Sequence, residues 1–184
     1  MHDNHAISTV ELYLEDEEAT IALAKRFAPL LCGTDETLGP EHRGGRIHLQ
    51  GDLGTGKTSF ARALLQAAGI TGRIKSPSYA LLETYKLFNL YFYHLDFYRF
   101  RDSREWIDAG FRDILQKEAV VLIEWPEQAG ALLPPPDLEI SLGYAEIGRS
   151  ARLTAYSNRG QLWLTTLALL PSGSPKKDNP GAAS

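Results

Sequence analysis

The chain has 184 residues, 43% of them hydrophobic and 23% charged, with a formal net charge of −4 and a pI near 5.7. This length favours one domain, and the acidic balance argues against a protein that grips nucleic acid alone, because that needs a basic face. The single cysteine, Cys32, excludes an internal disulfide framework and fits a reducing cytosol. A lone cysteine in a helical segment is most often a small buried apolar residue, which is the role predicted for Cys32. The sequence shows neither an apolar run of membrane-spanning length nor a signal-peptide pattern, so we expect a cytoplasmic protein.

The first elements follow from hydrophobic periodicity. Alternation predicts a strand over residues 9–14, and the acidic run from Asp16 opens a helix, because carboxylates are favourable in a first turn. Residues 33–45 are polar and contain glycine and proline, which predicts a surface loop. A strand over 47–50 and an amphipathic helix over 59–68 follow. The buried stripe of the first helix is predicted to contain Ile21, Ala24, Phe27, Ala28 and Leu31.

Between this second strand and second helix lies Gly51-Asp-Leu-Gly-Thr-Gly-Lys57-Thr58, which satisfies G-x-x-x-x-G-K-[ST] in the strand–loop–helix context that the motif needs. Glycines let backbone N–H groups turn toward phosphate oxygens, Lys57 can reach the β- and γ-phosphates, and the Thr58 hydroxyl can ligate Mg²⁺. No Asn-Lys-x-Asp run supports guanine selection, so ATP or ADP is the expected nucleotide. The residues predicted to bind it here are Gly51, Gly54, Thr55, Gly56, Lys57, Thr58 and Ser59.

The second half of the chain begins with an aromatic-rich segment. Residues 80–87 and 90–97 predict two paired strands around a turn at Asn89, and strand packing is favoured over a base-stacking platform for these aromatics. Residues 102–116 predict a helix interrupted at Gly110, and the apolar run 119–123 predicts a central strand buried on both faces. Two further strands are predicted over 138–142 and 151–157, then a helix or strand over 161–169. The Ser-, Gly- and Pro-rich tail 171–184 is predicted to be disordered.

Two carboxylates are candidates for the metal partner that a phosphate loop needs. Glu124 directly follows the apolar run 119–123, where a carboxylate would be held beside the metal. The alternative interpretation is that Glu124 only marks the point where that strand leaves the core. Asp96 shares one strand face with His94 and Tyr98 by period two, so Asp96 is the second candidate for holding metal or water. A lone histidine such as His94 is most often structural. Arg99 can pair with a carboxylate or serve the γ-phosphate, and the sequence leaves both open.

The phosphate loop, Ser76-Pro-Ser-Tyr79, His94-Leu-Asp-Phe-Tyr-Arg99 and Glu124-Trp-Pro126, in this order and spacing, resemble the bacterial TsaE (YjeE) ATPases. That family acts in the threonylcarbamoyladenosine modification of tRNA (t6A37). The resemblance implies a three-layer α/β fold of the P-loop NTPase type with a mixed parallel and antiparallel sheet. It also implies one ATPase domain over residues 1–170, ahead of the tail 171–184.

The same resemblance implies roles for individual residues. Lys57 and Thr58 would bind phosphate and Mg²⁺, Asp96 and Glu124 would be needed for hydrolysis with Glu124 near the metal, and Trp125 would support activity. Glu17 and Arg149 match positions that contact the nucleotide in relatives. The implied partners are TsaD-like and TsaB-like proteins, whose complex the ATPase would reset, with tRNA bound only within that complex and with weak hydrolysis in isolation.

Two other functions remain open at this stage. A small-molecule kinase would use the same loop for phosphoryl transfer but would need an acceptor pocket and an Arg-rich lid, for which Arg99, Arg101 and Arg104 form only a modest cluster. A non-catalytic binding module would hold the nucleotide as a structural element.

Overall fold

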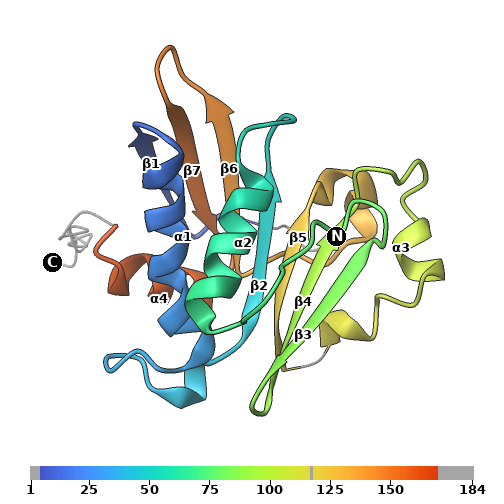
Figure 1. Ribbon diagram of the computed structural model, residues 1–184, viewed down its shortest axis with the longest axis horizontal. Coiled ribbons are helices and arrows are strands. Elements are labelled where there is room, and N and C mark those ends of the chain that lie inside the picture. Colours follow the sequence, from blue (N-terminus) through green and yellow to red (C-terminus); the bar gives the residue numbers. More distant parts are fainter. Residues whose placement is uncertain (1–4, 117, 170–184) are drawn as a thin grey trace, which may run out of the picture.

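The computed structural model describes residues 5–116 and 118–169, which contain a seven-stranded sheet of order β1-β7-β6-β2-β5-β4-β3 (Figure 1). Strand β2 pairs in parallel with β5 and β6, and β4 pairs in parallel with β5. The pairs β1–β7, β6–β7 and β3–β4 are antiparallel, which confirms the predicted mixed sheet. The strands are β1 Ser8–Leu14, β2 Gly45–Gln50, β3 Leu82–Leu87, β4 Leu90–Asp96, β5 Ala119–Glu124, β6 Leu138–Tyr144 and β7 Arg149–Ala155.

Helices α1 (Glu17–Cys32) and α2 (Lys57–Ala68) pack side by side across one face of the sheet (Figure 1). Their apolar stripes join a core cluster with α4 (Asn158–Thr166) and with residues from β1, β2, β4, β5, β6 and β7. A second, smaller cluster contains β4 and β5 residues together with α3 (Glu105–Asp108) and the 3₁₀ segments η2 (Ile114–Gln116) and η3 (Pro126–Leu132). The central strand β5 is therefore buried on both faces, as its continuous apolar run predicts.

Helix α1 begins and ends where its sequence specifies. The Asp16 side chain accepts a hydrogen bond from Ala19 N at 2.8 Å, which satisfies one of the donors that the first turn leaves free. Gly33 ends the helix in the left-handed conformation (φ 69°), where its N–H and that of Thr34 bond to the last carbonyls. The predicted stripe is buried except for Ile21, which is half-buried.

The predicted helix over 102–116 is wrong in extent, because only the four residues of α3 are α-helical and η2 is a single 3₁₀ turn. The Glu105 side chain accepts hydrogen bonds from the N–H groups of Arg101 and Asp102, and Asp102 accepts from Arg104 N. Such side-chain-to-backbone bonds compete with helical hydrogen bonding. Gly110 (φ 78°) then turns the chain so that Phe111 joins the second core.

Most of the elements predicted for the rest of the chain are present. The β3–β4 hairpin and the strands β6 and β7 form as predicted, and the ambiguous 161–169 segment is mostly the helix α4. Strand packing holds for Phe92 and Tyr93 but not for Tyr79 and Phe88, which are 85% and 88% exposed. The tail 171–184 lies outside the described residues. None of the helices within the described ranges is long and apolar enough to cross a membrane.

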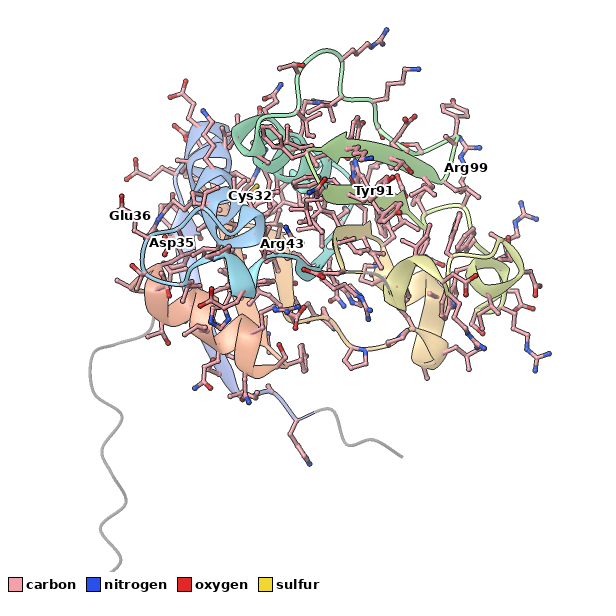
Figure 2. All side chains as sticks on the ribbon, turned by 90° about the horizontal axis from the view of Figure 1, so that it is seen from below. Cys32, Asp35, Glu36, Arg43, Tyr91 and Arg99 are labelled. Carbon is pink, nitrogen blue, oxygen red and sulfur yellow. The ribbon has the colours of Figure 1, made fainter. Side chains whose placement is uncertain are left out.

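The single cysteine is half-buried at the end of α1, and burial raises the pKa of its thiol. Figure 2 shows Cys32 well separated from Arg99. A thiol with a raised pKa is a poor nucleophile, so Cys32 fits the predicted structural role, although its side chain is only half-buried.

His48 makes stability depend on pH. It is 4% exposed on the sheet face opposite Ile47 and Leu49, and burial, with the charge of Arg46, lowers its pKa from 6.5 to about 3. The unfolded chain therefore binds this proton more readily, so stability is lost as the pH falls from 6.5 toward 3. We expect His48→Leu to flatten this dependence by up to about 1.4 kcal/mol per pH unit in denaturant titrations. The partly exposed His42, changed to Ala, is the control; equal slopes for His48→Leu and wild type would contradict the prediction.

Candidate functional site

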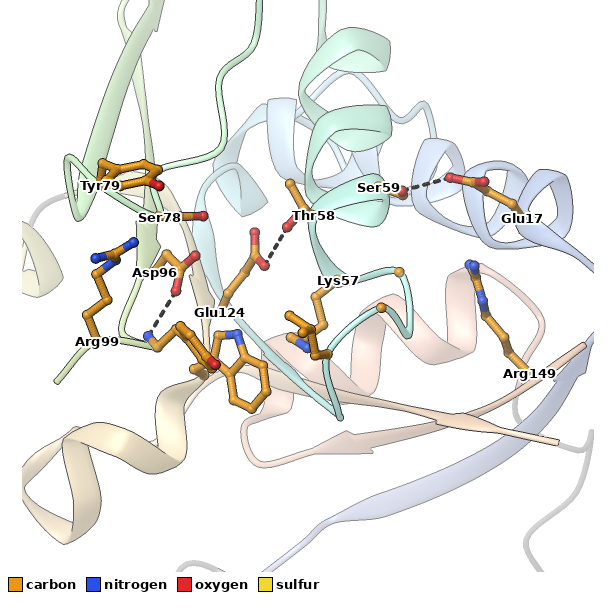
Figure 3. Close-up of a pocket in the computed structure, with 15 residues that line it drawn as sticks. Glu17, Lys57, Thr58, Ser59, Ser78, Tyr79, Asp96, Arg99, Glu124 and Arg149 are labelled. Carbon is orange, nitrogen blue, oxygen red and sulfur yellow. Dashed lines mark hydrogen bonds between the residues drawn. The ribbon is translucent and has the colours of Figure 1, made fainter. Parts of the chain in front are cut away.

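A cavity of about 560 Å³ lies at the carboxyl ends of β4 and β5, beside the loop that joins β2 to α2 (Figure 3). This is one edge of the parallel part of the sheet. Ligands of open α/β sheets bind at this edge, outside the carboxyl ends of the strands. Ten of the predicted site residues line the cavity, whereas Gly51 and Thr55 do not. The ten are Glu17, Gly54, Gly56, Lys57, Thr58, Ser59, Asp96, Glu124, Trp125 and Arg149.

The glycines of the phosphate loop are required by its close packing. Gly51 (φ 133°) has no room for a side chain, because a Cβ there would collide with Leu142 O. Gly56 (φ 106°) lies against the Arg149 guanidinium and directly precedes α2. Within the described residues no side chain caps the first turn of α2, so its free N–H groups and the positive end of the helix dipole face the cavity. This arrangement favours an anion.

Lys57 is held at the cavity wall by its own loop and by an aromatic ring. Its Nζ donates to Gly51 O at 2.6 Å and to Asp52 O at 2.8 Å, and lies 4.0 Å from the centroid of the Trp125 ring. Only 4% of the residue is exposed, and this burial lowers the pKa of the ammonium although nearby carboxylates oppose the shift. The two carbonyl groups thus orient the ammonium, and anionic oxygens, which are stronger acceptors, can replace them.

Glu124 is bound on both of its carboxylate oxygens. Thr58 Oγ1 donates to Oε2 at 2.8 Å, and His94 Nε2 lies 2.7 Å from Oε1 (the Thr58 bond is drawn in Figure 3). Glu124 is 2% exposed and His94 is fully buried. The carboxylate predicted from the end of the apolar run therefore touches the hydroxyl predicted from the phosphate loop, although 66 residues separate them.

Asp96 stands directly opposite Glu124 in the parallel β4–β5 register. One of its oxygens accepts a hydrogen bond from Tyr98 N at 2.9 Å. Burial, reinforced by the charge of Glu124, raises the pKa of Asp96. A carboxylate with a raised pKa accepts a proton more readily than an exposed aspartate does.

Comparison with known proteins identifies the family of this chain. The family model described as "Threonylcarbamoyl adenosine biosynthesis protein TsaE" matches residues 14–152. The chain belongs to the TsaE family. It is 34% identical to TsaE of Haemophilus influenzae over 81% of this chain and 91% of that protein, and 39% identical to TsaE of Rickettsia felis over 71% of each. The crystal structure of Bacillus subtilis YdiB superposes with a TM-score of 0.70 at 27% identity, covering 89% of this chain and 97% of that one.

The two flanks of the cavity in this TsaE-family chain carry arginines with different environments (Figure 3). On one side Glu17 accepts from Ser59 Oγ at 2.8 Å, and Arg149 donates to Thr20 Oγ1 at 3.2 Å, so helix α1 is tied to α2 and to β7. On the other side the Arg99 guanidinium stacks over the exposed Tyr79 ring at 4.3 Å. Arg149 is thus fixed by a polar contact, whereas Arg99 is held by an aromatic surface.

Sequence reasoning missed several contacts of the TsaE-family site. Tyr144 donates its hydroxyl to Leu53 O at 2.7 Å and supports the tip of the phosphate loop from β6. Trp125 has a left-handed backbone (φ 56°) and packs against Tyr98 with ring centroids 5.0 Å apart. No local signal in the sequence marks Tyr144, because only the fold brings β6 beside the loop. The Pro126 that follows Trp125 does mark a sharp change in chain direction.

The residues of the cavity fit a magnesium ion that is bound together with a nucleotide. They fit less well a metal that is held by protein side chains alone. Across residues 5–116 and 118–169, no three His, Cys, Asp or Glu side chains converge to hold a metal. The cavity does offer a hydroxyl and carboxylate pair, Thr58 and Glu124, with Asp96 adjacent. Mg²⁺ prefers oxygen ligands and keeps waters and substrate phosphates in its shell.

Proposed function

We propose that the protein is a magnesium-dependent ATPase of tRNA threonylcarbamoyladenosine biosynthesis. The observation that carries the proposal is the Thr58–Glu124 hydrogen bond at 2.8 Å beside the uncapped start of α2. It joins the metal-binding hydroxyl of a phosphate loop to a buried carboxylate at the end of a neighbouring strand, which is the arrangement of P-loop NTPases. Membership of the TsaE family supports the pathway.

The chain's own groups would bind a triphosphate in defined ways. The free N–H groups of the loop and of the first turn of α2 donate to phosphate oxygens. Lys57 exchanges its bonds to Gly51 O and Asp52 O for charged acceptors, while Trp125 keeps the ammonium in place. Thr58 and Glu124 would hold Mg²⁺, which when bound neutralises charge that develops on the transferring phosphoryl group.

Asp96 is the residue placed to act on the attacking water. Its raised pKa and its position beside Glu124 suit it to accept a hydrogen bond from that water and then a proton as the oxygen joins the γ-phosphorus. The bond to the leaving ADP oxygen breaks in the same transfer. The hydrogen bond from Tyr98 N fixes the carboxylate that receives the proton.

The open flank of the site supports dependence on a partner. Tyr79 and Tyr98, 85% and 51% exposed, line the cavity with Arg99 at its mouth. Exposed aromatic and arginine side chains are enriched at protein interfaces. We infer that a TsaD-like and TsaB-like pair covers this flank and completes the site, so that the isolated protein hydrolyses ATP slowly and hydrolysis resets the pair.

The proposal is tested by reconstituting tRNA modification with and without the protein, and with a nonhydrolysable ATP analogue in a third arm. We expect the analogue to permit about one round of modification and ATP to permit many. Radiolabelled γ-phosphate should pass to water; transfer to a metabolite would favour the kinase alternative. A protein that neither binds magnesium ATP nor changes the yield of modified tRNA would refute the proposal.

A further inference from the structure

A histidine lies behind the site, within the core. His94 is fully buried on β4, two residues before Asp96 and on the same strand face. It stands opposite Leu122 of β5, and the neighbouring positions on this face, Phe92 and Val120, are also fully buried. Burying a polar ring among such residues costs free energy unless it is hydrogen-bonded. A purely structural position here would favour an apolar side chain.

The hydrogen bond that offsets this cost is directed at the site. His94 Nε2 lies 2.7 Å from Glu124 Oε1, whereas Nδ1 is buried without a hydrogen-bond partner among the described residues. A proton on Nε2 fits this environment, because Nε2 then donates to the carboxylate. Among the described residues, the hydrogen-bond partner of the imidazole is therefore Glu124.

The geometry separates the two oxygens of Glu124. Oε1 is held from the core by His94, and Oε2 faces Thr58 at the cavity. A metal would bind the Thr58 oxygen through a lone pair, so the hydroxyl could still donate to Oε2. The other lone pair of Oε2 would then be available to the metal or its water, while His94 holds Oε1. The carboxylate then presents one oxygen in a fixed direction toward the metal or its water.

We propose that His94 is a positioning residue that orients Glu124 for magnesium bound with the nucleotide. This inference rests on the proposed function, and it assigns to the histidine of the His-x-Asp sequence a role separate from that of the aspartate. Partners that orient a metal-binding carboxylate typically contribute about 10- to 100-fold in metal affinity or activity. A defect in orientation should therefore appear in the magnesium requirement and not in binding of the nucleotide itself.

The test titrates Mg²⁺ into the protein with fluorescent N-methylanthraniloyl ADP and measures the same nucleotide in EDTA. For His94→Leu we expect the half-saturating Mg²⁺ concentration to rise about 10-fold or more, with affinity in EDTA within about 2-fold of wild type. His94→Gln keeps an N–H donor and should recover part of the loss. Mn²⁺ binding followed by electron paramagnetic resonance gives a second readout that does not depend on turnover.

Two comparisons separate positioning from damage to the fold. His48→Leu removes another buried histidine, on the opposite sheet face, and should leave the Mg²⁺ requirement unchanged. In a Glu124→Gln background His94→Leu should have little further effect, because its role passes through the carboxylate. If His94→Leu matches wild type in Mg²⁺ requirement, or weakens binding equally in EDTA, the positioning role is refuted while the proposed function stands. A wild-type protein that binds no magnesium nucleotide refutes both.

Discussion

Replacing Lys57 with alanine is expected to weaken ATP binding about 100-fold or more while the protein stays folded. The ammonium is 4% exposed and makes two short bonds to carbonyls of its own loop, so it is already desolvated and aimed before a ligand arrives. Hydrogen bonds to charged groups contribute about 1.5–3 kcal/mol each, and a triphosphate would offer at least two charged acceptors. Calorimetric titration of ATP with Mg²⁺ measures the loss.

The fold provides a matched control for this lysine. Lys86 on β3 is exposed and also lies over an aromatic ring, 5.1 Å from the centroid of Tyr91, but it does not line the cavity. Lys86→Ala should therefore leave ATP affinity within about 2-fold of wild type, since an exposed cation–π pair contributes only about 0.5–1 kcal/mol to local structure. Equal affinities of Lys57→Ala and Lys86→Ala would show that the loop is not the binding site.

The parts of the site that could be predicted are those whose signal is local in the chain. Strand, glycine loop and helix are consecutive, so the phosphate loop and its two ligand-binding side chains followed from one motif. Period-two geometry placed His94 and Asp96 on one face, and a run of apolar residues predicted that Glu124 ends a buried strand. These signals need no knowledge of which strands are neighbours.

The convergence of these residues depends on strand order, and the sequence does not state strand order. Asp96 meets Glu124 only because β4 pairs in parallel with β5, and Thr58 meets Glu124 only because β2 is the other neighbour of β5. The family resemblance implied a mixed sheet and roles for Asp96 and Glu124, but neither the resemblance nor periodicity predicted the strand order. The contact from Tyr144 to the loop was missed for the same reason, since it depends on β6 pairing with β2.

The error over residues 102–116 has a different origin. A helical pattern of apolar residues is present there, but Asp102 and Glu105 bond to nearby backbone N–H groups and Gly110 adopts a left-handed conformation. The apolar residues Trp106, Phe111 and Leu115 are buried against β4 and β5 by turns instead of by one helix. The apolar residues are buried as the periodicity predicts, but the backbone that carries them is not a continuous helix. Periodicity therefore predicted the buried residues correctly and the secondary structure wrongly.

Glu124→Ala is expected to lower the rate of ATP hydrolysis by the partner-bound protein at least about 100-fold, equivalent to about 2.7 kcal/mol of transition-state stabilisation. The substitution removes the carboxylate that Thr58 and His94 both contact, so no group replaces it beside the metal. Nucleotide affinity in EDTA should change only a few-fold, because the glycine loop, Lys57 and the start of α2 remain. Phosphate release and nucleotide binding, measured on the same preparations, separate these effects.

Glu139 is the control, because it is a partly buried glutamate outside the cavity that also bonds to a neighbouring side chain. It accepts a hydrogen bond from Gln50 Nε2 of β2 at 2.9 Å. Glu139→Ala should retain hydrolysis close to that of wild type. If Glu124→Ala also retained it, the nucleotide would be a structural element and the non-catalytic alternative would be favoured. A loss confined to Glu124→Ala, with nucleotide still bound, would instead place the chemistry where the phosphate loop meets the end of β5. Hydrolysis, and not nucleotide binding alone, would then be the property that the buried Thr58–Glu124–His94 network serves.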